Sequence, residues 1–243
     1  MTDLHTHILP AMDDGARDVE TSLAMLAEEM AQGVQRVALT PHFYRDEERP
    51  ERFLARRQKS WDMLRLALER SGARVPKLIL GAEVNWVPGL HRWEELGRLC
   101  LGNSRFLLLE LPDVPWRSAM IDQIYDMMDS SGVTPVLAHL DRYFSTQKPD
   151  YIRELLCMGA PVQISAEPVL HLMQRGKLLR RIGNHPNCML ISDCHNLTTR
   201  RPNLGPGMVQ IEKRFPEGAA AMKRNSRRIF ELAAGKECCY APK

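Results

Sequence analysis

Seven short apolar runs alternate with helical patterns along the chain, and this alternation constrains the fold more than any other feature. The runs cover residues 3–5, 36–40, 77–80, 106–111, 134–138, 161–165 and 189–192. Most are continuous Leu or β-branched stretches, as expected for parallel strands that are buried on both faces. The pattern predicts a barrel-like or doubly wound parallel α/β fold.

Helical periodicity fills the gaps between these runs. Asp18 can cap a first helix that ends at Gly33, and further helices are expected over 51–71, 118–131, 149–158, 169–182 and 218–234. The segment 81–105 has a weaker pattern and is interpreted as an irregular excursion between strands. The 243 residues contain no linker or repeat, so residues 1–243 are expected to form a single domain.

Charge and hydropathy exclude several classes of protein. The net charge is only +3, and no apolar stretch approaches 18 residues, so we expect no nucleic-acid partner, no stable membrane insertion and a cytoplasmic location. The six cysteines form no C-x-x-C pair, and vicinal Cys238 and Cys239 suit a zinc site poorly. In a chain of this length they are expected to be reduced thiols.

Histidines and carboxylates stand at the carboxyl ends of six of the seven predicted strands. His5 and His7 are two residues apart, so both imidazoles point to one face of the first strand. The strand ends and the loop after the first strand supply His5, His7, Asp13, Asp14, His42, Glu83, Glu110, His139, Asp193 and His195. The carboxyl ends of parallel strands meet at one edge, where α/β proteins bind their ligands. Five of the eight histidines fall at this edge, which predicts a site rather than separate structural roles.

Imidazole and carboxylate donors without thiolate suit Zn²⁺, Mn²⁺ or Fe²⁺. The donors are too many for one tetrahedral ion and instead indicate two or three ions that share a bridging carboxylate. Such clusters generate hydroxide at neutral pH and hold phosphoryl oxygens. Arg142 and Arg200 follow two of the candidate ligands and can each bind two phosphate oxygens. The adjacent Arg201 is an alternative to Arg200.

These segments, in this order, resemble the PHP (polymerase and histidinol phosphatase) superfamily. More narrowly, residues 1 to about 206 are similar to the bacterial CpsB/CapC/YwqE-type metal-dependent protein-tyrosine phosphatases. The motifs that carry the resemblance are His5-x-His7, Asp14 in an Asp-Asp-Gly turn, Thr-Pro-His42, Gly-Ala-Glu83, Leu-Glu110, Ala-His139-x-x-Arg142-Tyr143 and Ser-Asp193-x-His195-Asn196-Leu-Thr-Thr-Arg200. The family often has Pro-Glu where this chain has Leu140-Asp141, a difference that affects the loop that aims Arg142.

The resemblance implies a distorted seven-stranded (β/α) barrel of the PHP type with three divalent ions, usually Mn²⁺. His5, His7, Glu83 and Asp193 would hold one ion. Glu83 would be shared with a second ion, which Glu110 and His139 complete, and the third would use Asp14, His42 and His195. Arg142 and Arg200 would bind the phosphate.

The implied activity is hydrolysis of phosphotyrosine, with the tail of a bacterial tyrosine kinase that controls capsule or exopolysaccharide synthesis as substrate. A homo-oligomer is left open. The alternative within the superfamily is a small-molecule phosphatase such as a histidinol phosphatase. A catalytically silent module that binds a kinase tail is a third hypothesis, although the complete ligand set opposes it. The modest charge opposes a nuclease.

Three further features of the sequence bear on mechanism and substrate binding. Cys194-x5-Arg200 has the bare spacing of cysteine-dependent tyrosine phosphatases, but no glycine lies between to bend a phosphate-binding loop. The basic helix expected over 51–71 is either a solvated face or a guide for an acidic substrate tail. Phe43, Tyr44 and Trp86 follow candidate ligands closely and are candidates to stack on a tyrosyl ring.

Overall fold

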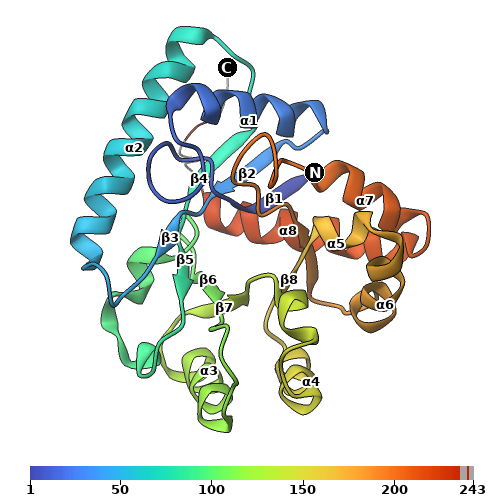
Figure 1. Cartoon of the computed structure of the whole chain (residues 1–243). Coiled ribbons are helices and arrows are strands. Elements are labelled where there is room, and N and C mark those ends of the chain that lie inside the picture. The colour runs from blue at the N-terminus through green and yellow to red at the C-terminus, as the bar shows by residue number, and fades with distance from the viewer. Residues whose placement is uncertain (236–239, 241–243) are drawn as a thin grey trace.

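The computed structural model describes residues 1–235 and residue 240, which form an α/β arrangement with helices packed around parallel sheets (Figure 1). Cys238 and Cys239, discussed above as a poor zinc pair, lie outside the described residues. Cys100, Cys157, Cys188 and Cys194 are free thiols, as expected. No helix among the described residues is long and apolar enough to cross a membrane.

All seven expected strands form, and two of them continue after a break as separate short strands. The strands are β1 (Thr2–Thr6), β2 (Arg36–Leu39), β3 (His42–Phe43), β4 (Lys77–Leu80), β5 (Glu83–Asn85), β6 (Phe106–Glu110), β7 (Thr134–Leu137), β8 (Val162–Ser165) and β9 (Cys188–Ile191). They make a three-stranded sheet in the order β1-β2-β4 and a six-stranded sheet in the order β3-β5-β6-β7-β8-β9, and every pair of strands is parallel.

The breaks occur at Thr40–Pro41 and at Gly81–Ala82. Proline lacks the N–H that a ladder needs. A Cβ on Gly81 would lie 2.6 Å from the Leu101 side chain, so the chain passes too close there for any larger residue. Both breaks precede candidate ligands, and they move His42 and Glu83 from the ends of β2 and β4 to the starts of β3 and β5.

Helices cover the sheets, and most were predicted to within a few residues. They are α1 (Val19–Ala31), α2 (Pro50–Ser71), α3 (Ser118–Ser130), α4 (Pro149–Cys157), α5 (Ala166–Leu170), α6 (Leu172–Ile182), α7 (Leu204–Glu212) and α8 (Pro216–Ala234), with 3₁₀ turns η1 (Leu90–Arg92), η2 (Glu94–Leu99) and η3 (Leu140–Phe144). The helix expected over 169–182 is two helices. The segment expected to be irregular contains β5, η1 and η2.

Helix α7 was not predicted, because its Gly-Pro-Gly start has the composition of a loop. Tertiary packing explains it. A Cβ on Gly207 would lie 2.8 Å from the Cβ of Ala166 in α5, so glycine lets the two helices approach each other closely.

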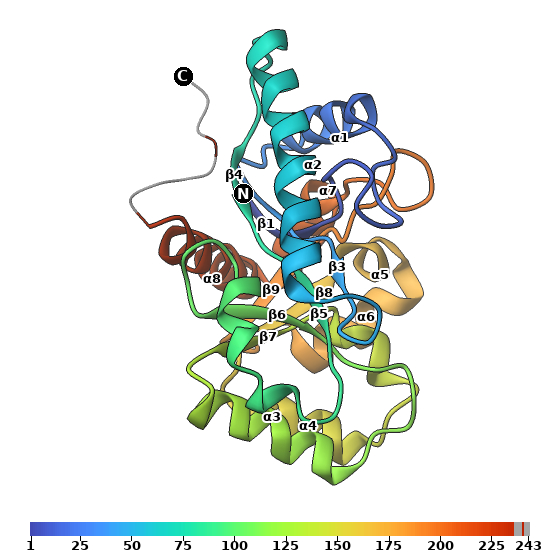
Figure 2. The same ribbon diagram turned by 90° about the vertical axis from the view of Figure 1, so that its left-hand side faces the viewer.

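Two apolar clusters hold the structure together. The larger lies between the strands and the surrounding helices. The smaller joins one or two residues from each of six strands to α8, and consists of Leu4, Ala38, Ile79, Leu101, Leu108, Val136, Ala138, Met189, Ile191, Ile229, Phe230 and Ala233. Figure 2 shows α8 beside the strands on the side where β1 begins, so the opposite, carboxyl edge of the sheets is left for the loops that follow the strands.

The first and last strands also meet. Thr6 and Cys194 form an isolated parallel bridge, and the His7 N–H donates to the Cys194 carbonyl at 2.9 Å. The α/β class with parallel strands is therefore confirmed, while the two sheets of the described residues do not show the closed seven-stranded barrel.

Candidate metal centre

The contact between β1 and the segment after β9 brings the first and last candidate ligands together. The Asp193 N–H donates to the His5 carbonyl at 3.1 Å. His5 and His7 therefore lie beside Asp193 and His195, although almost 190 residues separate the two pairs in sequence. Such proximity follows from strand order alone, because adjacent parallel strands end at the same edge.

Short β3 and β5 position the next pair. His42 and Glu83 are register partners in these parallel strands, and Glu110 ends the neighbouring β6. His139 follows β7 with φ 28°, and Asp193 follows β9 with φ 54°. Left-handed backbone is unfavourable for such residues and concentrates at functional sites, so two candidate ligands occupy strained positions that the surrounding fold must maintain.

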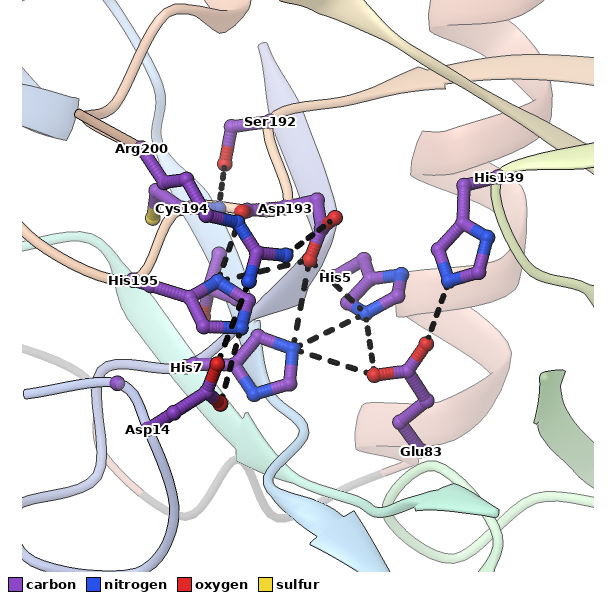
Figure 3. Close-up of polar contacts among 12 residues, drawn as sticks. His5, His7, Asp14, Glu83, His139, Ser192, Asp193, Cys194, His195 and Arg200 are labelled. Carbon is purple, nitrogen blue, oxygen red and sulfur yellow. Dashed lines mark hydrogen bonds and ion pairs between the residues drawn. The ribbon is translucent and has the colours of Figure 1, made fainter. Parts of the chain in front are cut away.

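Glu83 is the centre of the cluster (Figure 3). Its Oε2 lies 3.0 Å from His5 Nε2, 3.2 Å from His7 Nε2 and 3.0 Å from His42 Nδ1, and its Oε1 lies 2.8 Å from His139 Nε2. Its side chain is 1% exposed. One buried carboxylate thus faces four imidazoles, which is the arrangement expected of a bridging ligand.

The other candidate ligands surround this centre. Asp193 Oδ1 lies 3.5 Å from His5 Nε2 and 3.4 Å from His7 Nε2. Asp14 Oδ1 lies 3.3 Å from His195 Nε2. Ligand atoms within 4.8 Å of one another form four overlapping groups: His5, His7 and Asp193; His5, Glu83 and His139; His42, Glu83 and Glu110; and His7, Asp14, His42 and His195. All nine predicted ligands belong to at least one group. The groups differ from the expected sets. Glu83 is absent from the group of His5, His7 and Asp193, and Glu110 groups with His42 instead of His139. His7 is an additional member of the group that contains Asp14.

The ligand atoms of the cluster are arranged to bind cations and not to hydrogen-bond with one another. His5 Nε2 faces His7 Nε2 at 3.2 Å, and a proton on both nitrogens would make them repel each other. The buried atoms His42 Nδ1, Glu83 Oε2 and His195 Nε2 have no hydrogen-bond partner among the described residues. Buried polar atoms are normally satisfied, and these converge on shared space with the donor types that Mn²⁺, Zn²⁺ and Fe²⁺ prefer.

Glu83 and His195 have the protonation states that metal binding requires. Burial opposes ionisation of Glu83, but the positive field of His5 and the close contacts of His139 and His42 hold the pKa of Glu83 well below its usual range. Burial and the charge of His7 lower the pKa of His195 to about 3, so its imidazole is neutral near pH 7, the form that binds metal.

Two supporting residues of the cluster were not assigned a role from the sequence. Asp13 Oδ2 accepts from His7 Nδ1 at 2.7 Å and from the His42 N–H at 2.9 Å. Gln163 Oε1 lies 3.0 Å from His5 Nδ1. Such contacts fix the orientation of a metal-binding imidazole. The sequence does mark Gln163 as unusual, because it is a polar residue between the apolar Val162 and Ile164 of the buried strand β8.

The Asp-Asp-Gly turn packs directly against the end of β1. A Cβ on Gly15 would lie 2.1 Å from the His7 carbonyl oxygen, so only glycine fits there. The close approach lets Asp13 reach His7 and Asp14 reach His195.

The arginines lie on the rim of the cluster. Arg142 and Arg200 both donate to Asp193 Oδ2, Arg200 at 2.9 Å, and their side chains are 42% and 38% exposed. Both line a hollow of about 230 Å³ together with Asp193. Arg201 also lines this hollow, but its guanidinium pairs with Glu28 at 2.6 Å, whereas Arg200 contacts Asp14 and Asp193. These contacts favour Arg200 of the two alternatives.

Of the three aromatic candidates, Phe43 cannot reach a substrate. It is fully buried and packs against Phe53 and Trp93. Tyr44 stacks on His42 with ring centroids 5.3 Å apart and is half-buried, so Tyr44 and the half-buried Trp86 remain candidates.

The cysteine-dependent alternative is not supported. Cys194 is fully buried, and its Sγ lies 3.7 Å from the Glu29 carboxylate. Burial and the charge of Glu29 raise the pKa of the Cys194 thiol well above its usual value, whereas a nucleophilic cysteine needs a lowered pKa and access to substrate.

Cys194→Ser is therefore expected to retain phosphatase activity, with kcat/KM changed by no more than about threefold. The measurement is steady-state hydrolysis of a phosphotyrosine peptide by wild type and variant at equal metal content. A hundredfold loss in a folded, metal-loaded variant would revive the thiolate mechanism.

Comparison with known proteins identifies relatives along almost the whole chain. The family model described as "Capsular polysaccharide synthesis, CpsB/CapC" matches residues 1–231. Tyrosine-protein phosphatase CpsB of Streptococcus agalactiae serotype III (strain NEM316) is 27% identical over 246 residues, which cover 93% of this chain and 99% of that protein. Tyrosine-protein phosphatase YwqE of Bacillus subtilis (strain 168) is 28% identical over 227 residues, covering 88% of this chain and 85% of that protein.

One solved structure shows the same fold. It comes from the crystal structures of YwqE from Bacillus subtilis and CpsB from Streptococcus pneumoniae, described as unique metal-dependent tyrosine phosphatases. The two chains superpose with a TM-score of 0.82 at 24% identity, over 96% of this chain and 95% of that chain.

Proposed function

The chain belongs to the CpsB/CapC family of capsular polysaccharide synthesis proteins, and on this premise we propose that it is a metal-dependent protein-tyrosine phosphatase. The observation that carries the proposal is the convergence of nine imidazole and carboxylate ligands around Glu83, with two arginines on the rim. The names of the relatives, tyrosine-protein phosphatases CpsB and YwqE, support it.

The cluster is proposed to hold three divalent ions, with Mn²⁺ favoured and Zn²⁺ or Fe²⁺ as alternatives. His5, His7, Asp14, His42, Glu83, Glu110, His139, Asp193 and His195 would be the ligands, and Glu83 would be shared between ions. When bound, the ions would supply an activated water and would neutralise charge on the phosphoryl oxygens.

The residues of the chain have separate tasks in this proposal. Arg142 and Arg200 would bind the phosphoryl oxygens that face away from the cluster. Asp13 and Gln163 hold His7 and His5 in place. The leaving phenolate of tyrosine has a conjugate-acid pKa of about 10 and departs more easily than an alkoxide, so a phosphotyrosine substrate depends little on a general acid.

Metal removal tests this function. Chelation is expected to lower hydrolysis of a phosphotyrosine peptide by more than about a hundredfold, or about 2.7 kcal/mol of barrier, and added Mn²⁺ should restore it. Elemental analysis of the purified chain should find about three ions per chain if each proposed group of ligands binds one. Metal content near zero together with full activity would refute the proposal.

Substrate comparison separates the alternatives. A protein-tyrosine phosphatase should hydrolyse a phosphotyrosine peptide far faster than histidinol phosphate, whereas a small-molecule phosphatase should show the reverse.

We further propose that the substrate is the tail of a bacterial tyrosine kinase that controls capsule synthesis. We also propose that residues 1–243 act as one cytoplasmic domain whose strands close into a seven-stranded barrel.

A further inference from the structure

A second hollow adjoins the one that contains the arginines. Asp141, Arg142 and Pro168 line both, so the two are continuous. The second hollow has a volume of about 310 Å³, and its other walls come from η3 and α6. A substrate whose phosphate lies on Arg142 therefore has a path along the surface toward α6.

The walls of this second hollow carry three positive charges. Arg142 is one, and Lys177 and Arg181 of α6 are the others. Lys177 is exposed, and Arg181 lies over the Phe144 ring at 4.3 Å and donates to the Phe144 carbonyl at 3.4 Å. Within the part of the chain that the structure describes, no carboxylate lies within 4.0 Å of the charged nitrogens of Lys177 or Arg181.

The one acidic wall residue does not neutralise these cations. Asp141 is half-buried, and its Oδ1 accepts the backbone N–H of Ser165 at 2.9 Å. Phe144, Leu178 and Pro168 provide the apolar part of the walls. The hollow therefore combines apolar walls, which would contact the stem of a side chain, with Lys177 and Arg181, neither of which pairs with a carboxylate among the described residues.

We propose that this second hollow is a subsite for an acidic side chain of the substrate, a Glu or Asp close in sequence to the phosphotyrosine. The inference rests on the proposed phosphatase function and specifies its substrate. Lys177 and Arg181 would pair with the carboxylate while Arg142 pairs with the phosphate. Since cations that face a shared hollow attract anions and steer their approach, the subsite would favour acidic sequences before any chemistry occurs.

The other candidate guide for an acidic substrate, the basic helix α2, is less suitable. Arg56 pairs with Glu48, and Arg65 pairs with Glu69 at 2.7 Å. Arg57 donates to the Gly81 carbonyl at 2.6 Å. Arg56 and Arg65 of α2 are thus paired with carboxylates of the chain, whereas Lys177 and Arg181 have no carboxylate partner among the described residues.

The test compares two phosphotyrosine peptides that differ only in flanking Glu or Gln residues. Wild type is expected to show a kcat/KM for the Glu peptide about fivefold higher, the size of one exposed ion pair. The preference should appear in KM rather than kcat, because a flanking contact binds ground state and transition state alike. It should also shrink as salt rises, since exposed charges are screened.

Variants of α6 assign the preference. Lys177→Gln should reduce it, and Lys177→Gln with Arg181→Gln should abolish it. Arg180→Gln removes an equal charge from the same helix at an exposed residue outside the hollow and should keep the preference. Arg181 contacts Phe144 of η3, the turn that also contains Arg142, so the double variant could displace Arg142. Lys177→Gln alone leaves this contact intact and controls for that effect.

Each outcome decides the matter. A wild type without preference, or a double variant that keeps it, overturns the subsite. Hydrolysis of phenyl phosphate at the same metal content separates this failure from failure of the proposed function. A chain that hydrolyses phenyl phosphate without peptide preference loses only the subsite, whereas a metal-loaded chain inactive on every aryl phosphate loses both.

Discussion

Glu83→Gln is expected to lower kcat/KM for a phosphotyrosine peptide by about a thousandfold or more, equivalent to about 4 kcal/mol of transition-state stabilisation. The two oxygens of Glu83 face four imidazoles at 2.8–3.2 Å. A neutral amide keeps the shape of the side chain but cannot bridge two cations, because its NH₂ group has no lone pair available for a metal ion. Steady-state kinetics and elemental analysis on the same samples measure the loss of activity and of bound metal.

Stability must be followed in parallel. In the metal-free chain, Glu83 compensates the charge of buried imidazoles. Burial alone would lower the pKa of His139, but its hydrogen bonds to Glu110 and Glu83 raise that pKa to about 9. Removing one partner of a buried ion pair costs about 3–5 kcal/mol, so thermal unfolding of the metal-free variant should show a lower Tm. The loss of activity can be assigned to the loss of metal only if the variant remains folded at the assay temperature.

Glu167→Gln is the matched control. Glu167 lines the same hollow as the arginines, but its carboxylate pairs with His171 and Asn203 outside the cluster. This variant should keep its metal content and most of its activity. The bridging role of Glu83 is wrong if Glu83→Gln retains both its ions and more than about a tenth of its activity.

The position of the site could be predicted from sequence because it depends on few facts. Apolar runs give the strands, and parallel strands that neighbour one another end at one edge. His5, Glu83 and Asp193 were therefore expected at one edge, and the contact of β1 with the segment after β9 brings the first and last of them together. The chain needed only to be divided correctly into strands and helices, and for the strands the apolar pattern was sufficient.

Contacts that depend on loop geometry were not accessible in the same way. Asp13 and Asp14 are adjacent in sequence, and only the close packing of Gly15 on β1 places Asp13 behind His7 while Asp14 faces His195. Helix α7 was missed for a related reason, since its glycines are selected by contact with α5 and not by local preference. In both cases tertiary packing outweighs the local pattern.

Arg200→Ala is expected to lower kcat/KM by about a hundred- to a thousandfold, the cost of losing a charged donor to a transition-state oxyanion. Its side chain lies at the mouth of the cluster, where Nη2 contacts Asp193 at 2.9 Å and Nη1 contacts Asp14 at 3.4 Å. A planar guanidinium can bind two phosphoryl oxygens, so Arg200→Lys should recover only part of the loss. The readouts are steady-state kinetics and competitive inhibition by inorganic phosphate.

Arg201→Ala provides a control one residue away. It removes the same charge from the same loop, but its guanidinium is paired with Glu28 and its side chain is 59% exposed, so its activity should stay within about threefold of wild type, as for a surface ion pair. Arg142→Ala should behave like Arg200→Ala, because both arginines contact the same oxygen of Asp193. If Arg201→Ala were as damaging as Arg200→Ala at unchanged metal content, the loop would act through its overall charge. Phosphate would then have to be held by the ions and Arg142 alone.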